Sequence, residues 1–391
     1  MRRWMRTAVS LGVAALLGAT APGVRVGATA ERGTGGGRPG GPVEGPAFDL
    51  QAHRGGIGLN QESSLASFSY AMELGVTTLE LDVQITEDGQ AVVTHDRRTN
   101  PLNCVDTAPA VPGDPEFPYV GRYVRDLTVA QLKTLDCGTR RPPDPTTDRY
   151  IDSQIPSPGA RMLLLTEVFD LVKAYRADGP CGVMLNIETK VEAGAPEQTA
   201  PREQFVQVTA QLVRDAGLLD NVTIQSFDWG ALIRMREVEP RLPIVALTNG
   251  QQFLQAGQPG ASPWLGGIDI DDFGGSFVAA AASFGADAIS PVHGDPQGGS
   301  ILDPGYVPYT TQEMVDDAHA AGMKVIPWTV NDIATMDRLI GLGVDGLITD
   351  YPDRLRDLLE LRGFALPRTH EPRGEAGPGD RRDNRACRTP W

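Results

Sequence analysis

Two histidines and two acidic residues stand where they could carry out proton transfer beside a metal ion. His53 and His95 each end an apolar run, although the chain has only five histidines. Between them, Glu80 and Asp82 lie two residues apart in a β-rich segment, so both side chains point to the same face of a strand. Imidazole groups titrate near neutral pH and suit general acid–base catalysis.

A third acidic residue and two basic residues extend this set. Glu188 and Lys190 repeat the period-two spacing near the end of a later β-rich run, and Arg54 follows His53 directly. Three inward carboxylates repel one another unless they are protonated or neutralised, and all-oxygen ligation suits Ca²⁺ or Mg²⁺ better than zinc. Lys190 and Arg54 can bind a phosphate group. The alternative is that these carboxylates only form buried ion pairs with the two basic residues.

Alternating strands and helices are expected to position these residues. The pattern predicts a parallel (β/α)8 TIM barrel, because eight β-rich runs alternate with segments of helical spacing. A doubly wound open sheet is the alternative, but no glycine-rich dinucleotide motif follows the first run. The predicted strands are 48–53, 77–85, 183–189, 222–226, 243–248, 286–290, 324–330 and 345–349, with 91–95 returning from the second as a hairpin. The predicted helices are 65–74, 165–177, 203–216, 228–238, 311–321, 332–342 and 353–362.

The candidate residues fall at strand ends, where barrels of this kind place their function. An ordered set of motifs along 47–357 also resembles the glycerophosphodiester phosphodiesterase family. The set consists of His53-Arg54-Gly55, Glu62, "LASF", Glu80-x-Asp82, His95-Asp96, "NIETK", "QSFDW", "VIPWTVND" and "GVDGLITDYPD".

The resemblance implies a role for each candidate. His53 and His95 would be the acid/base pair, Glu80, Asp82 and Glu188 the metal ligands, and Arg54 and Lys190 the phosphate contacts. Trp328 would lie beside the glycerol moiety, although simple packing is an equal alternative. The implied cofactor is one divalent cation, with Ca²⁺ favoured over Mg²⁺. This chain has Gln-Glu-Ser-Ser at 61–64 where the family usually has Pro-Glu-Asn-Thr, which affects the ordering of the first loop.

An insertion over the active-site face is expected between the hairpin and the next helix, at residues 97–160. It contains Cys104 and Cys137, and we expect a disulfide between them that stabilises the fold by roughly 3–4 kcal/mol on the chain-entropy model. Cys181 and Cys387 would pair by elimination. His293 follows a predicted strand, and we expect a loop role for it rather than catalysis.

The termini suggest export. A basic start and a short apolar run predict a signal peptide at 1–30, followed by a flexible Gly/Pro-rich leader at 31–46, the barrel at 47–362 and a disordered tail at 363–391. Losing four arginines with the signal peptide moves the net charge from −15 to −19. Such an acidic chain argues against nucleic acid as a partner. No further segment is expected to cross a membrane, and no protein partner is evident.

The expected function is metal-dependent hydrolysis of a small glycerophosphodiester to sn-glycerol 3-phosphate and an alcohol by a secreted enzyme. One alternative is a phospholipase D-type hydrolase of lysophospholipids or sphingolipids, which needs an apolar surface for acyl chains. Another is a catalytically silent phosphate-binding barrel, which would be expected to lack one of the histidines or metal ligands. Activity on glycerophosphocholine with and without chelator separates the three.

Overall fold

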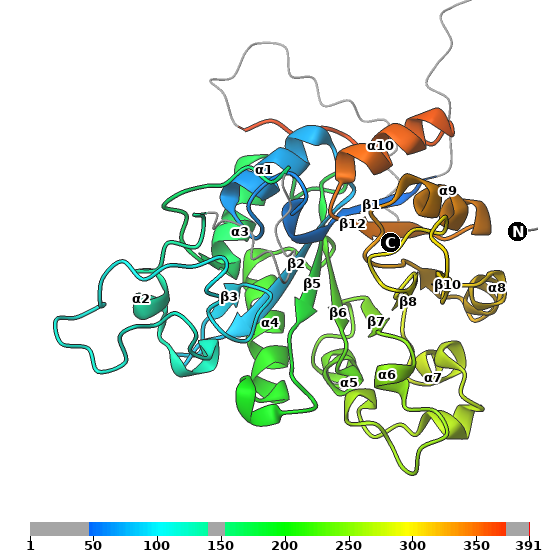
Figure 1. The fold of residues 1–391 in the computed structure, drawn as a ribbon, viewed down its shortest axis with the longest axis horizontal. Coiled ribbons are helices and arrows are strands. Elements are labelled where there is room, and N and C mark those ends of the chain that lie inside the picture. The colour runs from blue at the N-terminus through cyan, green and yellow to red at the C-terminus, as the bar shows by residue number, and fades with distance from the viewer. Residues whose placement is uncertain (1–46, 140–152, 373–390) are drawn as a thin grey trace, which may run out of the picture. The chain divides into compact units, whose positions relative to one another are not determined.

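A parallel sheet forms the centre of the folded part of the chain (Figure 1). The computed structural model describes residues 47–139, 153–372 and 391. Neighbouring strands follow the order β11-β8-β7-β6-β5-β2-β1-β12, and every pair along it is parallel. These strands are β1 (Asp49–Ala52), β2 (Thr78–Ile85), β5 (Met184–Thr189), β6 (Val222–Ser226), β7 (Ile244–Thr248), β8 (Ala288–Pro291), β11 (Lys324–Val325) and β12 (Gly346–Thr349).

Backbone hydrogen bonds join the two ends of this strand order and close the sheet into a barrel. Asp345 donates its N–H to the carbonyl of Val325 over 2.9 Å, and Ile348 donates to Pro327 over 3.0 Å. Val330 donates back to Ile348 over 2.9 Å. The predicted (β/α)8 barrel is therefore confirmed, and the open-sheet alternative is wrong.

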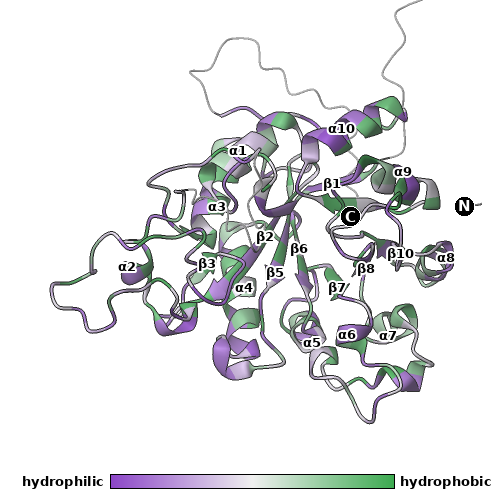
Figure 2. Ribbon diagram, in the orientation of Figure 1, coloured by the Kyte–Doolittle hydropathy of each residue, from purple (hydrophilic) through white to green (hydrophobic). Residues whose placement is uncertain are grey.

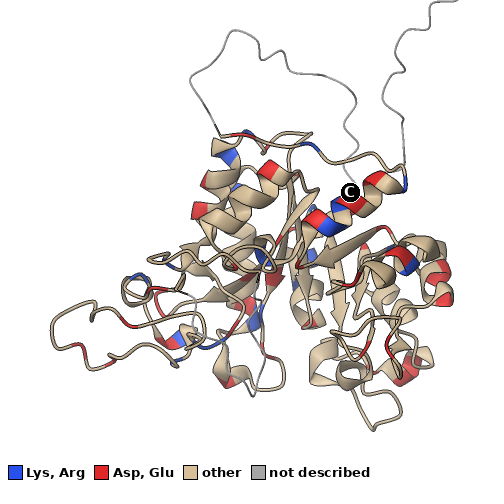
Figure 3. Cartoon of the chain, turned by 45° about the horizontal axis from the view of Figure 1, so that its top comes forward, with Lys and Arg blue, Asp and Glu red and all other residues tan. Residues whose placement is uncertain are grey.

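Helices surround the barrel and cover the outward side chains of its strands. The strands and the helices both carry hydrophilic as well as hydrophobic residues (Figure 2). Acidic and basic residues are spread over the outer helices (Figure 3). The helices are α1 (Leu65–Leu74), α3 (Leu165–Ala174), α4 (Arg202–Ala216), α5 (Trp229–Val238), α7 (Phe277–Ser283), α8 (Gln312–Ala320), α9 (Ile333–Leu342) and α10 (Pro352–Leu361). Shorter elements in the loops are α2 (Val129–Leu132), α6 (Gln251–Leu254), η1 (His53–Gly55), η2 (Val124–Asp126), η3 (Pro196–Gln198), η4 (Pro263–Leu265) and η5 (Ile270–Phe273).

Two departures from the predicted elements have local causes. The segment predicted as a strand at 324–330 contains only β11 and an isolated bridge at Trp328, since Pro327 has no N–H to donate to a ladder. Helix α7 was not predicted, because its alanine-rich sequence FVAAAAS is too short to show an apolar stripe. Both departures leave the strand order unchanged.

The inside of the barrel contains a hydrogen-bonded polar layer. Asn186 on β5 donates to Gln51 on β1 over 2.8 Å and to Gln225 on β6 over 2.9 Å. Gln225 donates in turn to Oε1 of Glu80 on β2 over 2.8 Å. All four side chains are essentially inaccessible to solvent, where an unpaired polar group is costly. The layer therefore fixes the orientation of Glu80.

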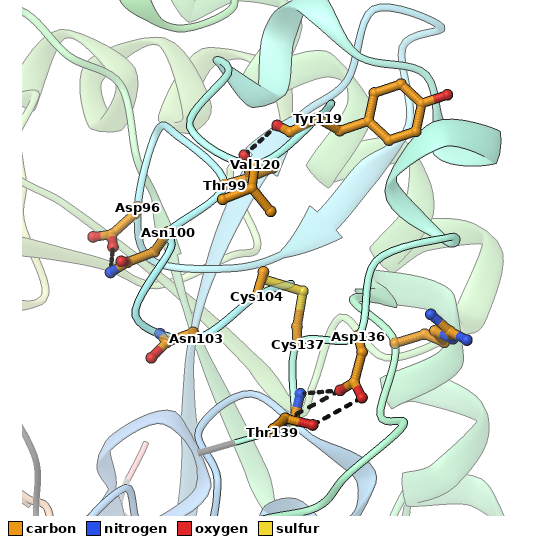
Figure 4. The surroundings of a disulfide bond; sticks show 12 residues. Asp96, Thr99, Asn100, Asn103, Cys104, Tyr119, Val120, Asp136, Cys137 and Thr139 are labelled. Atoms are coloured by element: carbon orange, nitrogen blue, oxygen red, sulfur yellow. Dashed lines mark hydrogen bonds between the residues drawn. A yellow bond between two sulfur atoms is a disulfide. The ribbon is translucent and has the colours of Figure 1, made fainter. Parts of the chain in front are cut away.

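The predicted insertion forms a cap with its own small core between β3 (Ala91–Val93) and β4 (Leu163–Leu164). Its buried residues include Tyr119, Val124 and Leu127. A disulfide joins Cys104 to Cys137 (Figure 4), so the predicted pairing is present. Cys387, the predicted partner of Cys181, lies outside the described residues.

The segment after α10 stays on the barrel instead of leaving it at residue 363. The ring of Phe364 packs edge-on against Phe48 with centroids 5.5 Å apart, and His370 donates its N–H to the carbonyl of Met72 over 2.9 Å. The first part of the tail expected to be disordered, 363–372, thus contacts the barrel. The remainder up to residue 390 lies outside the described residues.

The predicted signal peptide and leader, residues 1–46, also lie outside the described part of the chain. Within the ranges that are described, none of the helices combines the length and the apolar character that a membrane crossing requires.

Candidate active site

A pocket of about 700 Å³ opens at the C-terminal ends of the barrel strands. Of the eight residues predicted to form the site, all but Asp82 line this pocket. The seven lining residues are His53, Arg54, Glu80, His95, Glu188, Lys190 and Trp328. Asp82 is 1% exposed and lies beneath the pocket surface, where it contacts the lining residues Arg54 and Lys190. The sequence-predicted residues therefore converge in space.

The three predicted carboxylate ligands form one compact group. Strand register places Asp82 directly opposite Glu188 on the neighbouring strand, and Glu80 precedes Asp82 on the same face of β2. Ligand oxygens from the three residues lie within 4.8 Å of one another. Oδ2 of Asp82 is buried and has no hydrogen-bond partner among the described residues. Three hard oxygen donors around an unsatisfied carboxylate oxygen fit a divalent cation.

Burial and neighbouring charges shift the pKa values of all three carboxylates. Burial and the neighbouring Asp82 raise the pKa of Glu80 to about 7. Burial raises the pKa of Glu188 to about 8, with Asp82 adding to the effect of burial and Lys190 opposing it. Burial alone would also raise the pKa of Asp82, but Lys190, His95 and Arg54 outweigh it and hold that pKa well below its usual range.

Both predicted phosphate-binding cations also touch these carboxylates. Nζ of Lys190 lies 2.7 Å from Oε1 of Glu188 and 3.5 Å from Oδ1 of Asp82. Nε of Arg54 lies 3.2 Å from Oδ2 of Asp82, and its Nη1 lies 2.7 Å from Glu62. The ion pairs weighed as an alternative are thus present, and they coexist with the compact carboxylate group.

A sharp turn after β1 positions His53 and Arg54. Arg54 adopts a left-handed backbone conformation with φ of 51°, and its N–H donates to Oε2 of Glu80 over 2.9 Å. Gly55 follows with φ of 82°, and a Cβ at this position would stand 2.6 Å from the hydroxyl of Ser67 on α1. Glycine is therefore required at 55, because both the conformation and the close helix exclude a side chain.

An acidic residue holds each histidine of the pair. Nδ1 of His53 lies 2.5 Å from Oδ1 of Asp350, which follows β12. Asn331 donates to the other oxygen of Asp350 over 2.6 Å. Nδ1 of His95 lies 2.8 Å from Asp96, which accepts a hydrogen bond from Asn100 of the cap (Figure 4). In both histidines Nδ1 is occupied, so Nε2 is the atom available for proton transfer.

The two histidines differ in their electrostatic surroundings. Burial and Arg54 by themselves lower the pKa of His53, but Asp350 and Glu80 outweigh them and raise it above its ordinary value. For His95, burial together with Arg54 and Lys190 lowers the pKa to about 4. His53 therefore keeps its proton to a higher pH than an ordinary histidine, whereas His95 is neutral at neutral pH.

Asp350 and Asn331 were not among the predicted site residues. Asp350 comes directly after the predicted strand 345–349, so its place at a strand end could have suggested it. The first loop also uses a residue that sequence reasoning did not identify. Asn103 of the cap donates to Glu62 over 2.7 Å, so Glu62 is held although Ser63 replaces the asparagine usual in the family.

Trp328 begins a row of aromatic side chains along one wall of the pocket. Its indole N–H donates to the carbonyl of Ser290 over 3.1 Å, and its ring contacts Phe227 edge-on at 5.3 Å. It is therefore both packed and exposed to the pocket. His293 is 2% exposed, and its ring nitrogens bind Tyr306 and the carbonyl of Gln297, which agrees with the expected loop role.

Comparisons with known proteins identify the family of this chain. Residues 53–354 match the model of the glycerophosphoryl diester phosphodiesterase family. A glycerophosphodiester phosphodiesterase of Caldanaerobacter subterraneus is 28% identical over 80% of this chain and 98% of its own length.

Solved structures show the same fold. A candidate glycerophosphoryl diester phosphodiesterase of Silicibacter pomeroyi has a TM-score of 0.64 and 28% identity, covering 82% of this chain and 95% of its own. An Oleispira antarctica phosphodiesterase, solved with sn-glycerol-3-phosphate, has a TM-score of 0.53 and 19% identity over 81% and 97% of the two chains. The chain therefore belongs to the glycerophosphoryl diester phosphodiesterase family, whose members hydrolyse phosphodiesters.

Proposed function

We propose that this chain hydrolyses glycerophosphodiesters to sn-glycerol 3-phosphate and an alcohol, with the help of one divalent cation and two histidines. One observation carries the proposal. Two histidines, each held at Nδ1 by a carboxylate, face the same pocket as a compact group of three carboxylates and two basic residues. The family match supports the reaction class.

Glu80, Asp82 and Glu188 would hold the cation. Their oxygens suit Ca²⁺, which accepts a flexible set of carboxylate ligands, better than Mg²⁺, which keeps several waters in a strict octahedron. When bound, such an ion supplies charge stabilisation for the phosphoryl oxygens. Arg54 and Lys190 would bind the same phosphate, Arg54 by its planar guanidinium group and Lys190 as a point charge.

His95 would act as general base and His53 as general acid. Neutral His95 takes a proton through Nε2 from the attacking water molecule as the new P–O bond forms. If the glycerol 2-hydroxyl attacks instead, a water molecule then opens the cyclic phosphate to give sn-glycerol 3-phosphate. Protonated His53 gives its proton to the alkoxide as the P–O bond to the alcohol breaks. The carboxylates around His53 and the cations around His95 support this assignment. Each histidine is expected to contribute roughly 10²–10⁴-fold to the rate.

The test is turnover of glycerophosphocholine by the purified protein with added Ca²⁺, Mg²⁺ or chelator. We expect release of sn-glycerol 3-phosphate that stops in chelator and returns with Ca²⁺. His53→Ala and His95→Ala should both be nearly inactive. Hydrolysis that continues at the full rate in excess chelator would contradict metal dependence. Hydrolysis of lysophosphatidylcholine in preference to glycerophosphocholine would favour the lipid hydrolase. Binding of glycerophosphocholine without turnover would favour the catalytically silent barrel.

Export of the protein follows from the predicted signal peptide and is supported by the Cys104–Cys137 disulfide, since such bonds persist in oxidising compartments. N-terminal sequencing of the protein from the culture medium should find a start near residue 31. Recovery of the full-length chain from the cytosol alone would reject this proposal.

A further inference from the structure

A row of four aromatic side chains runs from the phosphate-binding side of the pocket to its far wall. Trp328 contacts Phe227 at 5.3 Å, Phe227 contacts Phe253 at 5.2 Å, and Phe253 stacks on Trp264 at 4.3 Å. All four line the pocket and all are partly exposed. The near end adjoins the phosphate contacts, because Nζ of Lys190 lies 5.7 Å from the Phe227 ring.

The far end of the row combines an aromatic face with a carboxylate. Glu192 also lines the pocket. Glu192 and Trp264 both lie next to Gly194. A Cβ atom built on Gly194 would stand 3.2 Å from Oε1 of Glu192 and 3.6 Å from Cζ2 of Trp264, so the carboxylate and the indole are neighbours. The other carboxylate oxygen, Oε2, pairs with Arg97, and the side chain of Arg97 is 45% exposed. Oε1 is therefore the oxygen directed toward the aromatic row.

This combination has a specific chemical preference. Aromatic faces attract cations through their quadrupole, and quaternary ammonium groups are recognised in this way because they carry charge but cannot donate hydrogen bonds. Oε1 of a carboxylate beside the rings adds attraction at close range without requiring a donor, while Arg97 on Oε2 offsets the charge of Glu192 at longer range. A neutral polyol would gain less from these ring faces and would depend on polar side chains of the pocket lining such as Asn249 and Thr329. An acyl chain would gain nothing from Glu192.

We propose that Phe253, Trp264 and Glu192 form a subsite for the quaternary ammonium group of a choline-type leaving alcohol. The proposal rests on the proposed function, because the alcohol must be attached to a phosphate held by Arg54 and Lys190. The aromatic row then joins the phosphate to the cationic end of the substrate. Preferred substrates are glycerophosphodiesters that carry a methylated ammonium group.

The experiment compares kcat/KM for glycerophosphocholine and glycerophosphoglycerol, which share the glycerophosphate part and differ in the charge of the alcohol. The wild-type enzyme should prefer glycerophosphocholine. Glu192→Gln and Trp264→Leu should reduce that preference by roughly five- to thirtyfold, mainly through KM, given the usual strength of cation–π contacts. Glu197→Gln is the matched control, since this exposed glutamate in η3 is absent from the pocket lining, and it should keep the wild-type preference.

The outcomes separate the two proposals. If neither substrate is hydrolysed, the proposed function itself is rejected. If both are hydrolysed but with equal kcat/KM, or if Glu192→Gln and Trp264→Leu lower both values alike, only the ammonium subsite is overturned. Glu192→Gln decides the matter if Trp264→Leu is unfolded by circular dichroism, because glutamine has nearly the same shape as glutamate.

Discussion

Replacing Asp350 by asparagine should slow catalysis while the pocket stays intact. Oδ1 of Asp350 lies 2.5 Å from Nδ1 of His53, and the side chain of Asp350 is 15% exposed. A hydrogen bond to a charged group contributes about 1.5–3 kcal/mol. If that contribution orients and charges His53 in the transition state, its loss corresponds to roughly 10- to 150-fold in kcat. Asn331, which donates to Asp350, is expected to hold the new amide in place.

The assay measures kcat for glycerophosphocholine as a function of pH. The Asp350 carboxylate helps to raise the pKa of His53, so its removal lowers that pKa. A general acid with a lower pKa loses its proton at lower pH, and the alkaline limb of the profile should move to lower pH. A substrate with a nitrophenol leaving group needs no proton on departure and should lose much less rate.

A matched control exists at the opposite end of the barrel. Asp345 precedes β12 and pairs with Nε2 of His319 over 2.9 Å, outside the pocket lining. Asp345→Asn removes an aspartate from a histidine pair in the same way and should leave both kcat and the pH profile unchanged. If Asp350→Asn retains the wild-type kcat and the wild-type alkaline limb, Asp350 has no role in positioning His53, and the acid assignment loses its support.

Three further results are expected. Ca²⁺ binding to the metal-free protein at pH 7 should release protons, because burial and mutual repulsion raise the pKa of Glu80 to about 7 and of Glu188 to about 8. Calorimetry in two buffers of different ionisation heat measures this release, and identical heats would contradict it. Replacing Cys104 and Cys137 by serine should destabilise the fold by roughly 3–4 kcal/mol and raise KM more than it weakens metal binding. Thermal unfolding and steady-state kinetics test this, and an unchanged melting temperature would refute the contribution of the bridge. Burial tends to raise the pKa of Asp136, but the N–H groups of Gly138, Gly159 and Thr139 and the Thr139 hydroxyl outweigh it and lower the pKa (Figure 4). The stability that Asp136 gives the cap is therefore complete above the ordinary aspartate range and is lost as the pH falls through the lowered pKa. Asp136→Asn should lower the melting temperature at neutral pH but much less in acid, and an equal difference at both pH values would oppose this.

The sequence identified the residues that repeat with the period of a strand. Glu80 and Asp82 could be placed on one face of β2 because alternate residues share a face, and the hydrophobic runs located the strand ends. This information is local, since it depends only on residues within a few positions of each other. Barrel architecture then brings the strand ends to one mouth, which is why His53, Glu188 and Lys190 could be assigned to the same site.

The residues that were missed depend on contacts between distant parts of the chain. Asp350 meets His53 across 297 positions, and Gln225 meets Glu80 across 145. Such contacts follow from strand order and register, which the hydrophobic pattern does not specify. Phe253 and Trp264 lie in irregular connections, where no periodicity indicates which way a side chain points. The cap core was missed for the same reason.

The charges of the site explain why an acidic protein can bind an anionic substrate. Among the described residues, four carboxylates lie around the two basic side chains Arg54 and Lys190. The carboxylates are those of Glu62, Glu80, Asp82 and Glu188. Without a metal ion the excess negative charge is relieved by protons on Glu80 and Glu188, as their raised pKa values indicate. A divalent ion would replace those protons and cancel the excess, leaving Arg54 and Lys190 to attract the phosphodiester. By holding the ion, the carboxylates would thus provide the local field that overcomes the net charge of −15 on the chain.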